Sequence, residues 1–553
     1  MEQIEIKSLY LTVLGNLDTS QIGRNSSLWD VLTLVTETVQ ELNISEIQKS
    51  NESAAKHRIA GNQLYQERKY AEALAYYTES IRLAEPESDQ LGMGYANRSV
   101  IYYEQGEFEL ALYNIDLAKR NNYPVMLMPK LLDREFNCKQ QIAAGRSKDT
   151  FPCLPMDIIV DTNPRIPFLA DGIGMTYGST YGRGMVAEKD FNPGDVILDE
   201  KIELCGVDLN LASEHCNHCS SRFNYSLIPC PTCPIFMYCS QECLEQNWKF
   251  YHRFECAVAT KLLSASYLPS MVCPRLFFYG LTQFDDDLQA MMEYCEKEIN
   301  VKFNPLDLDY TNLDRLEVFK ALHNTKPIDM PEIEHVVKYT ACAYYVVLLM
   351  NPAVSSIIRT ETHRQFFLRT LLQYVRVTCS LTSYSSRSLI NVGTISPVYS
   401  ICNHSCDPNA ITINDFGRTK LVILRPVRQG EQIFTSYTQT WWCPVYAGVR
   451  CCCNICDLEK ASQGWRTKFN RDFSPEVQRQ FEALKKDMDR ADLNAVAKLN
   501  RLQQFIQRYA ERYHPQKNFG MVLKGFSDLL DCAACNGNVA LAKAQLRATY
   551  AEH

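Results

Sequence analysis

Apolar residues recur at helical spacing near both ends of the chain. Within the first fifty residues this spacing predicts an amphipathic helix or two. The apolar positions are Leu28, Val31, Leu32, Leu34 and Val35. Residues 470–553 return to the same spacing. The apolar run from Tyr339 to Met350 is too short to span a membrane and predicts a buried helix.

A pattern with a period near forty residues repeats between residues 53 and 120. Tyr70 and Ala73 in the first unit correspond to Phe108 and Ala111 in the second. Small residues let paired helices approach closely, and the aromatic rings fill the space between them. The repeat resembles tetratricopeptide repeats (TPR), whose helix pairs stack to share a core. Because two units are few for such a stack, we expect helices near residues 30–50 and 126–143 to cap it.

Three polar residues of the repeats form either a peptide-binding site or a solvated helix face. Arg58 and Asn62 are four residues apart and share a helix face, and Asn97 occupies the corresponding position of the next unit. Clamp-type TPR domains use a basic residue and asparagines at these places to hold a C-terminal carboxylate, as in chaperone tails. The alternative is a solvated helix face, since no third basic partner is evident.

Strand-like segments occupy the middle of the chain. Residues 181–187 lead into residues 191–198, which contain Pro193 and Gly194 as a turn; the pattern predicts strand, turn, strand. Further strands are expected at residues 410–413 and 420–424. Gly182 and Gly184 form a G-x-G that lets the backbone approach a ligand, although a lone G-x-G is more often a tight turn.

Seven cysteines and one histidine follow metal-ligand spacing between residues 216 and 256. The pairs are C-x2-C, C-x2-C, C-x3-C and H-x3-C, which supply two complete tetrahedral zinc sites with no ligand left over. The ligands are Cys216, Cys219, Cys230, Cys233, Cys239, Cys243, His252 and Cys256. Closed four-ligand sites offer no position to a substrate, so catalysis must lie elsewhere.

Composition narrows the class of protein. A disulfide framework is the alternative to zinc, but it needs an oxidising compartment, and the start Met1–Lys7 does not have the pattern of a secretory signal. We expect a soluble, reduced, intracellular protein, cytoplasmic and/or nuclear, without a membrane partner. The 553 residues predict several domains, and the net charge of -7 argues against broad nucleic-acid binding.

Four motifs in fixed order carry a family resemblance. They are G-x-G at 182–184, NHSCDPN at 403–409, G-E-x4-S-Y at 430–437 and C-x-C-x2-C at 451–456. This order resembles a SET domain, and the eight-ligand ladder is similar to a MYND zinc finger. A MYND module placed between G-x-G and NHSC resembles the SET-and-MYND (SMYD) family. Repeats placed before the SET domain are similar to the branch of that family with N-terminal TPR units.

The resemblance implies an α+β multidomain fold. A split β-rich SET core with an inserted MYND zinc finger is expected to lie between α-helical, TPR-like N- and C-terminal domains. The implied boundaries are 1–50 for an N-terminal helical segment, 51–145 for TPR, 160–212 for the N-terminal part of SET, 213–258 for MYND, 259–375 for a helical SET insertion, 376–440 for the catalytic core, 441–458 for the post-SET zinc site and 459–553 for the C-terminal helical domain.

The resemblance also implies how three zinc ions are shared. One set is Cys216, Cys219, Cys239 and Cys243, and the second is Cys230, Cys233, His252 and Cys256. The third set joins Cys406 to Cys451, Cys453 and Cys456. Three cysteines alone leave a tetrahedral site one ligand short, which agrees with the fourth from NHSC.

The implied activity is S-adenosylmethionine-dependent N-methylation of histone or non-histone protein lysines. Such chemistry works by positioning and desolvation of a neutral amine and needs no metal at the reacting centre. The residues implied for cofactor binding are Gly182, Arg183, Gly184, Asn403, His404 and Tyr437. Tyr437 is also the implied catalytic residue.

One segment departs from the family pattern. The linker Thr438–Arg450 is short and has Ala447 and Val449 at places where relatives carry aromatic residues that line the lysine channel. An alternative function therefore stays open: a scaffold with weak or no catalysis that binds protein partners through its MYND and TPR surfaces. MYND fingers in general take proline-rich peptides, which are the partners expected there.

Overall fold

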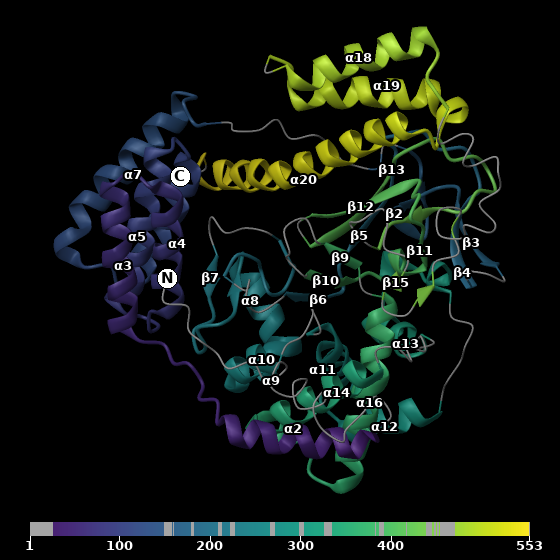
Figure 1. Cartoon of the computed structure of the whole chain (residues 1–553). Helices are drawn as coiled ribbons and strands as arrows, with labels where there is room; N and C mark the ends of the chain where they lie inside the picture. The colour runs from purple at the N-terminus through teal and green to yellow at the C-terminus, as the bar shows by residue number, and fades with distance from the viewer. Residues whose placement is uncertain are drawn as a thin grey trace.

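The structure is a computed structural model of the chain. It describes residues 26–148, 158, 160–178, 182–207, 213–221, 227–265, 271–297, 304–325, 334–381, 383–385, 392–415, 417–437, 445–446, 449–450, 453, 471–490 and 492–551. Helices surround a group of small sheets, and the N-terminal helices form a separate lobe (Figure 1).

Consecutive helix pairs form the N-terminal lobe. Its helices are α3 (Asn51–Gln66), α4 (Tyr70–Leu83), α5 (Asp89–Glu104), α6 (Phe108–Arg120) and α7 (Met128–Ala143). Helix α3 packs on α4, α5 packs on α6, and α7 packs on α6. Ala73 and Ala111 are completely buried, as expected for small residues at helix contacts. The two helix pairs that the repeat predicts are therefore present.

A five-stranded sheet in the order β1-β2-β5-β13-β12 combines both halves of the chain within the described residues. Its strands are β1 (Thr162–Asn163), β2 (Ile166–Ala170), β5 (Val196–Lys201), β12 (Ala410–Asp415) and β13 (Arg418–Ile423). Leu421 of β13 lies opposite Leu198 of β5, and Ala410 of β12 lies opposite Ile423. Segments more than two hundred residues apart thus share one core.

Shorter pairings lie beside this sheet. They are the hairpin of β3 (Ile173–Gly178) with β4 (Gly182–Ala187), the sheet of β6 (Leu204–Val207), β10 (Val392–Ile395) and β9 (Ser383–Ser385), the parallel pair of β11 (Asn403–His404) with β14 (Phe434–Thr435), and the pairs of β7 (Ile228–Pro229) with β8 (Met237–Tyr238) and β15 (Val445–Tyr446) with β16 (Val449–Arg450). The strand predicted within residues 181–187 forms as β4, and the strand predicted within residues 191–198 begins only at Val196, as β5. The two pair with other strands and not with each other.

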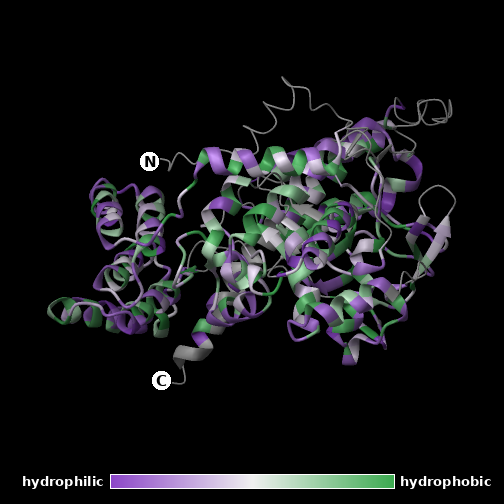
Figure 2. Ribbon diagram, turned by 90° about the horizontal axis from the view of Figure 1, so that it is seen from below, coloured by the Kyte–Doolittle hydropathy of each residue, from purple (hydrophilic) through white to green (hydrophobic). Residues whose placement is uncertain are grey.

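Helices fill the region between the cysteine-rich segment and the second half of the sheet. They are α8 (Gln241–Asn247), η3 (Trp248–His252), α9 (Arg253–Glu255), η4 (Cys256–Val258), α10 (Ala259–Ala265), α11 (Val272–Gln283), α12 (Leu288–Lys297), η5 (Pro305–Asp307), η6 (Tyr310–Asn312), α13 (Arg315–His323), α14 (Glu334–Leu349), α15 (Pro352–Ser355), α16 (Glu361–Leu381) and η8 (Tyr399–Ile401). The amphipathic helix α2 (Leu28–Leu42) buries Val31, Val35 and Val39 against α14. Figure 2 shows hydrophobic residues gathered toward the middle of the molecule.

The C-terminal helices connect the strands to the N-terminal lobe. They are α18 (Pro475–Asp489), α19 (Ala495–Tyr513) and α20 (Lys517–Ala551). Helix α20 contacts β12 and α6, and it runs from the strands toward the lobe (Figure 1). Lys543 on α20 pairs with Glu107 at 2.6 Å, and Arg547 pairs with Glu109. Among the described helices, none is both long and apolar enough to cross a membrane.

Candidate functional site

The second ligand cluster consists of Cys230, Cys233, His252 and Cys256, all buried. Its cysteines come from the β7–β8 hairpin and η4, and its histidine ends η3. His252 Nε2 lies 3.2 Å from Cys230 Sγ and 3.5 Å from Cys233 Sγ. Cys230 Sγ lies 3.9 Å from Cys256 Sγ. Tetrahedral bonds to zinc near 2.3 Å place sulfur ligands about 3.8 Å apart, so this donor set fits zinc.

The first ligand cluster consists of Cys216, Cys219, Cys239 and Cys243. Cys239 Sγ lies 3.6 Å from Cys219 Sγ and 3.5 Å from Cys243 Sγ. Ser240 caps α8 and accepts the backbone hydrogen bond of Cys243, which orients the last ligand. In both clusters all ligand atoms lie within 4.8 Å of one another. The structure thus brings together the two interleaved sets that the sequence resemblance implies.

A buried ion pair supports the second ligand cluster, and the sequence reasoning missed it. Arg275 donates to both carboxylate oxygens of Glu255, at 2.7 and 3.0 Å. Glu255 Oε2 in turn lies 3.6 Å from Nδ1 of the ligand His252. The Glu255 carboxylate thus lies beside the ring of this ligand histidine, just beyond hydrogen-bond distance. The available signal was a single charge, Arg275, inside the otherwise apolar helix α11.

Arg275 also connects the two clusters to the sheets. Its Nη1 donates to the backbone carbonyls of Cys205 and Asn217, each at 2.7 Å. Cys205 lies in β6, and Asn217 lies between two ligands of the first cluster. Both Arg275 and Glu255 are almost completely buried. One guanidinium therefore ties the first cluster, the second cluster and β6 together.

Arginine side chains of the N-terminal lobe donate hydrogen bonds to the cysteine-rich segment. Arg98 on α5 is buried and donates to the carbonyl of Leu227 at 3.1 and 3.2 Å. Arg82 at the end of α4 donates to the carbonyl of Pro234. Burial lowers the pKa of Lys49 to about 8, while the thiols of the second cluster act in the opposite direction. The lobe is thus fastened next to the second ligand cluster.

The tyrosine cluster lies on the other side of the sheets. We use this name for Cys402, Asn403, His404, Asn409 and Tyr437. Strand β11 runs parallel to β14, with Asn403 opposite Phe434. The buried side chain of Asn409 donates to the carbonyl of Gln432 at 2.9 Å and accepts from the amide of Phe434 at 2.8 Å. These bonds fix β14 three residues before Tyr437.

Tyr437 makes two hydrogen bonds within this cluster. Its hydroxyl donates to the carbonyl of Cys402 at 2.7 Å, and its backbone amide donates to Nδ1 of His404 at 2.9 Å. Burial raises the pKa of Tyr437 well above its usual value, so the phenol is neutral at neutral pH. Burial lowers the pKa of His404, which agrees with an acceptor at Nδ1.

The G-x-G segment meets the tyrosine cluster from β4. Asn403 donates to the carbonyl of Arg183 at 2.6 Å. Gly182 has φ +66°, a conformation that favours glycine. A Cβ on Gly184 would lie 1.7 Å from Nε2 of Gln432. The backbone at Gly184 therefore passes close to the side chain of Gln432, and the predicted approach of this backbone to a ligand stays a prediction.

The predicted third zinc set is described only in part. Cys406 and Cys453 are buried, and Cys406 Sγ lies 3.3 Å from Nε2 of His404. Cys451 and Cys456 lie outside the described residues. The third set therefore stays a prediction.

The two asparagines of the predicted carboxylate clamp contact each other, and Arg58 contacts a different residue. Asn62 accepts hydrogen bonds from Asn97 at 2.8 Å and from Tyr77 at 3.0 Å. Arg58 reaches Gln90 at 3.3 Å. The three residues thus share one face of the lobe, with their amide groups engaged within the protein.

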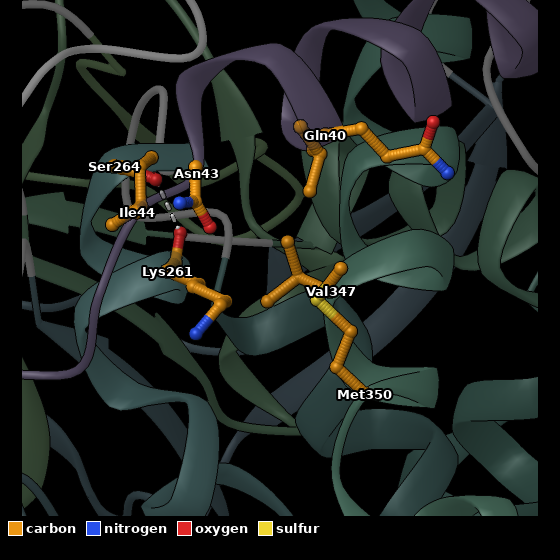
Figure 3. Close-up of a pocket in the computed structure, with 8 residues that line it drawn as sticks. Gln40, Asn43, Ile44, Lys261, Ser264, Val347 and Met350 are labelled. Carbon is orange, nitrogen blue, oxygen red and sulfur yellow. Dashed lines mark hydrogen bonds between the residues drawn. The ribbon is translucent and has the colours of Figure 1, made fainter.

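A hollow of about 280 Å³ lies between α2, α10 and the end of α14, and it contains none of the predicted site residues (Figure 3). Its polar lining residues are Gln40, Asn43, Lys261 and Ser264. The Lys261 ammonium pairs with Glu46 at 3.0 Å. The hollow shares no residue with the tyrosine cluster.

Known proteins resemble this chain over the region just described. The family model for the SET domain matches residues 182–438. Protein-lysine N-methyltransferase SMYD4 of Danio rerio is 23% identical over 66% of this chain and 55% of its own length. The Homo sapiens protein of the same name is 23% identical over 46% of this chain and 39% of its own length. The chain therefore spans only part of these relatives.

Other relatives include histone-lysine N-methyltransferase ASHR1 of Arabidopsis thaliana, 26% identical over 49% of this chain and 51% of its own length. The solved SET domain of LSMT bound to lysine and AdoHcy aligns over 68% of this chain and 88% of its own, with 10% identity. Its TM-score of 0.23 is too low for a structural argument.

Proposed function

We propose that this chain, a SET-domain protein related to the SET-and-MYND (SMYD) family, is an S-adenosylmethionine-dependent protein-lysine N-methyltransferase. Its substrates would be lysines of histone or non-histone proteins, in the cytoplasm and/or the nucleus. The convergence of Arg183, Asn403, His404 and Tyr437, which come from segments more than two hundred residues apart, carries the proposal. The named activities of SMYD4 and ASHR1 support it.

The residues of the tyrosine cluster suit a reaction that proceeds by positioning. When bound, S-adenosylmethionine would supply its electrophilic methyl group to the lone pair of a neutral lysine amine, the methyl C–S bond breaking as the N–C bond forms and S-adenosylhomocysteine leaving. Gly182, Arg183, Gly184, Asn403 and His404 would hold that cofactor. The raised pKa of Tyr437 keeps its hydroxyl protonated, so it orients the amine and does not deprotonate it. The proton of the product ammonium leaves to solvent.

Zinc would serve structure and not the chemical step. The donor sets of the two ligand clusters fit zinc, and closed tetrahedral sites leave no open coordination position. We propose that this segment is a MYND finger inserted in the SET domain and that the N-terminal lobe is a TPR domain. Proline-rich peptides at the finger and a chaperone C-terminal tail at Arg58, Asn62 and Asn97 are proposed partners. If a chaperone C-terminal peptide does not bind the chain, the proposed chaperone partner is ruled out.

Cofactor binding and methyl transfer test the function separately. Titration calorimetry should detect S-adenosylmethionine binding by the zinc-loaded chain, and radiolabelled methyl groups should then reach a protein substrate. Tyr437→Phe should lower kcat about 100-fold or more, because the hydroxyl that orients the amine is lost. Tyr70→Phe on α4, far from the cluster, is the matched control.

A second candidate function is a binding scaffold with weak or no catalysis. The short segment after Tyr437, with Ala447 and Val449 in place of aromatic residues, favours it. A chain that fails to bind S-adenosylmethionine, yet retains zinc and partner binding, would replace the enzyme proposal by the scaffold.

A further inference from the structure

We propose that Glu200 is a positioning residue for Tyr437. Glu200 fixes the turn that begins at Val398, and this turn ends in the Cys402 carbonyl that accepts the Tyr437 hydroxyl. The inference rests on the proposed methyl transfer and adds a residue to it that lies in neither the G-x-G nor the NHSC motif.

Glu200 is a buried carboxylate on the central strand β5, only 2% exposed. Its two oxygens accept the backbone amides of Val398 at 2.9 Å and Tyr399 at 2.8 Å. Both acceptors therefore point at consecutive amides at the start of η8. A carboxylate that accepts two backbone amides holds them more firmly than a neutral acceptor does.

A second buried contact joins the same turn to the sheet. Ser396 donates from its hydroxyl to Thr419 Oγ1 at 3.1 Å, and both residues are completely buried. Thr419 lies directly opposite Glu200 in the β5–β13 pairing. The turn is thus attached to two adjacent strands of the five-stranded sheet, immediately before it enters the tyrosine cluster.

Backbone hydrogen bonds carry this placement on to Cys402. The amide of Ile401 donates to the carbonyl of Val398 at 3.3 Å, and the amide of Cys402 donates to that of Tyr399 at 2.8 Å. The carbonyl of Cys402 then accepts the Tyr437 hydroxyl at 2.7 Å. The path from the Glu200 carboxylate to the Tyr437 hydroxyl runs through a single turn of 3-10 helix.

The side chain of Tyr399 attaches the turn to the strands next to Tyr437. Its hydroxyl lies 2.8 Å from Thr412 Oγ1 on β12 and 3.3 Å from Thr435 Oγ1 on β14. Thr435 is two residues before Tyr437. Glu200 at the turn's amides and Tyr399 at its side chain therefore hold the two partners, Cys402 and Tyr437, in fixed relation.

The charge state of Glu200 adds a pH readout. Burial raises the pKa of Glu200 to about 8, although the two amide donors act in the opposite direction. Glu203 after β5 raises this pKa further and Arg418 on β13 lowers it. Tyr310 on η6 also faces the carboxylate. Since the ionised form binds the amides more firmly, the turn is best fixed at pH values above about 8.

The test compares Glu200→Gln with the wild-type chain. A glutamine has almost the same shape, but its NH2 group faces an amide donor in place of a carboxylate oxygen. We expect kcat to fall at least about tenfold, with unchanged S-adenosylmethionine affinity and zinc content. The ratio of wild-type to variant kcat should grow as pH rises from 7 to 9, since titration of the substrate amine cancels in the ratio. Glu482→Gln, an exposed change on α18, is the matched control.

Each outcome decides one proposal. If the wild-type chain transfers no methyl group, the proposed function fails. If it turns over and Glu200→Gln keeps its kcat at every pH, the positioning role is wrong. Should Glu200→Gln fail to fold, Tyr399→Phe tests the same turn from its other end. A loss of kcat without loss of cofactor affinity is expected there too, and an unchanged kcat would overturn the inference.

Discussion

The second ligand cluster and the tyrosine cluster are held in place in opposite ways. The second ligand cluster brings four side-chain ligands together, and neutral or negative ligand atoms at these distances need a shared cation. The tyrosine cluster is closed by hydrogen bonds to backbone groups of the chain itself, as at Cys402, Gln432 and Phe434. The second ligand cluster therefore depends on a bound ion for its geometry, whereas the tyrosine cluster is held in place by the chain itself.

Among the changes that test this difference, removal of zinc should reduce the stability of the protein most. Structural zinc sites contribute on the order of 10 kcal/mol to folding, so a chelator should unfold the cysteine-rich segment and loosen the N-terminal lobe that touches it. Thermal unfolding together with metal analysis by mass spectrometry checks this. The partly exposed first cluster should lose its metal before the buried second one. Equal melting temperatures with and without zinc would contradict the prediction.

Arg275→Met should give the next largest effect. The change leaves the buried Glu255 carboxylate without its bidentate partner, and loss of one member of a buried pair costs about 3–5 kcal/mol. Denaturant unfolding measures the loss. Arg253→Met is the matched control, because the Arg253–Asp286 pair is partly exposed and should contribute about 1 kcal/mol or less. Similar losses for both variants would show that the network does not support the cluster.

Asn409→Ala tests the preformed cluster. The change leaves the half-buried carbonyl of Gln432 and the half-buried amide of Phe434 without the Asn409 side chain, which should cost about 2–4 kcal/mol in the free energy of unfolding. Zinc content should stay the same, while methyl transfer falls. Asn494→Ala removes an exposed helix cap on α19 and should cost about 1 kcal/mol. Loss of zinc from the second ligand cluster in Asn409→Ala would mean that the two clusters are not independent.

The contact between Asp407 and His514 should give the smallest effect and a defined pH dependence. Burial raises the pKa of Asp407, but the hydrogen bond from His514 at 2.8 Å outweighs it and the pKa lies below its usual value. A lowered folded pKa stabilises the protein above the unfolded value near 3.9 and loses this contribution as pH falls through the folded value.

His514→Gln should therefore cost about 1 kcal/mol at neutral pH, and its difference from wild type should shrink below about pH 4. Unfolding midpoints measured between pH 3 and 7 check this. A difference that persists unchanged at pH 3 would contradict the assignment of the shift to His514.

The sequence predicted the structure best where a residue type has one usual role, such as a cysteine in a zinc-ligand pair or an alanine at a close helix contact. The spacing of the eight ligands predicted two zinc sites, and the family resemblance implied which ligands share each site. The alanines at 73 and 111 predicted the helix pairs. The sequence was less informative about which strands pair when those strands lie far apart in the chain. Nothing local shows that β4 pairs with β3 and that β5 pairs with β13, because turn residues mark where strands end and not which strands they meet.

Buried polar residues were the principal omission. Arg275, Glu255 and Glu200 look like surface charges in a sequence, since charged residues are seldom completely buried. Each acquires its role only from partners far away, such as Cys205 for Arg275 and Val398 for Glu200. The close approach of Gln432 to Gly184 likewise joins residues far apart in the chain, and no local pattern shows it.

The contacts at the two ends of helix α20 depend on the number of residues between them. Its early turns contact β12, while Lys543 and Arg547 near its end meet acidic residues of α6. One inserted residue between these contacts would turn the end of the helix by about 100° and advance it by about 1.5 Å. Both cations would then face away from Glu107 and Glu109. An insertion or deletion of a single codon within α20 should therefore break the contacts at one end of the helix, even though it removes none of the contacting residues.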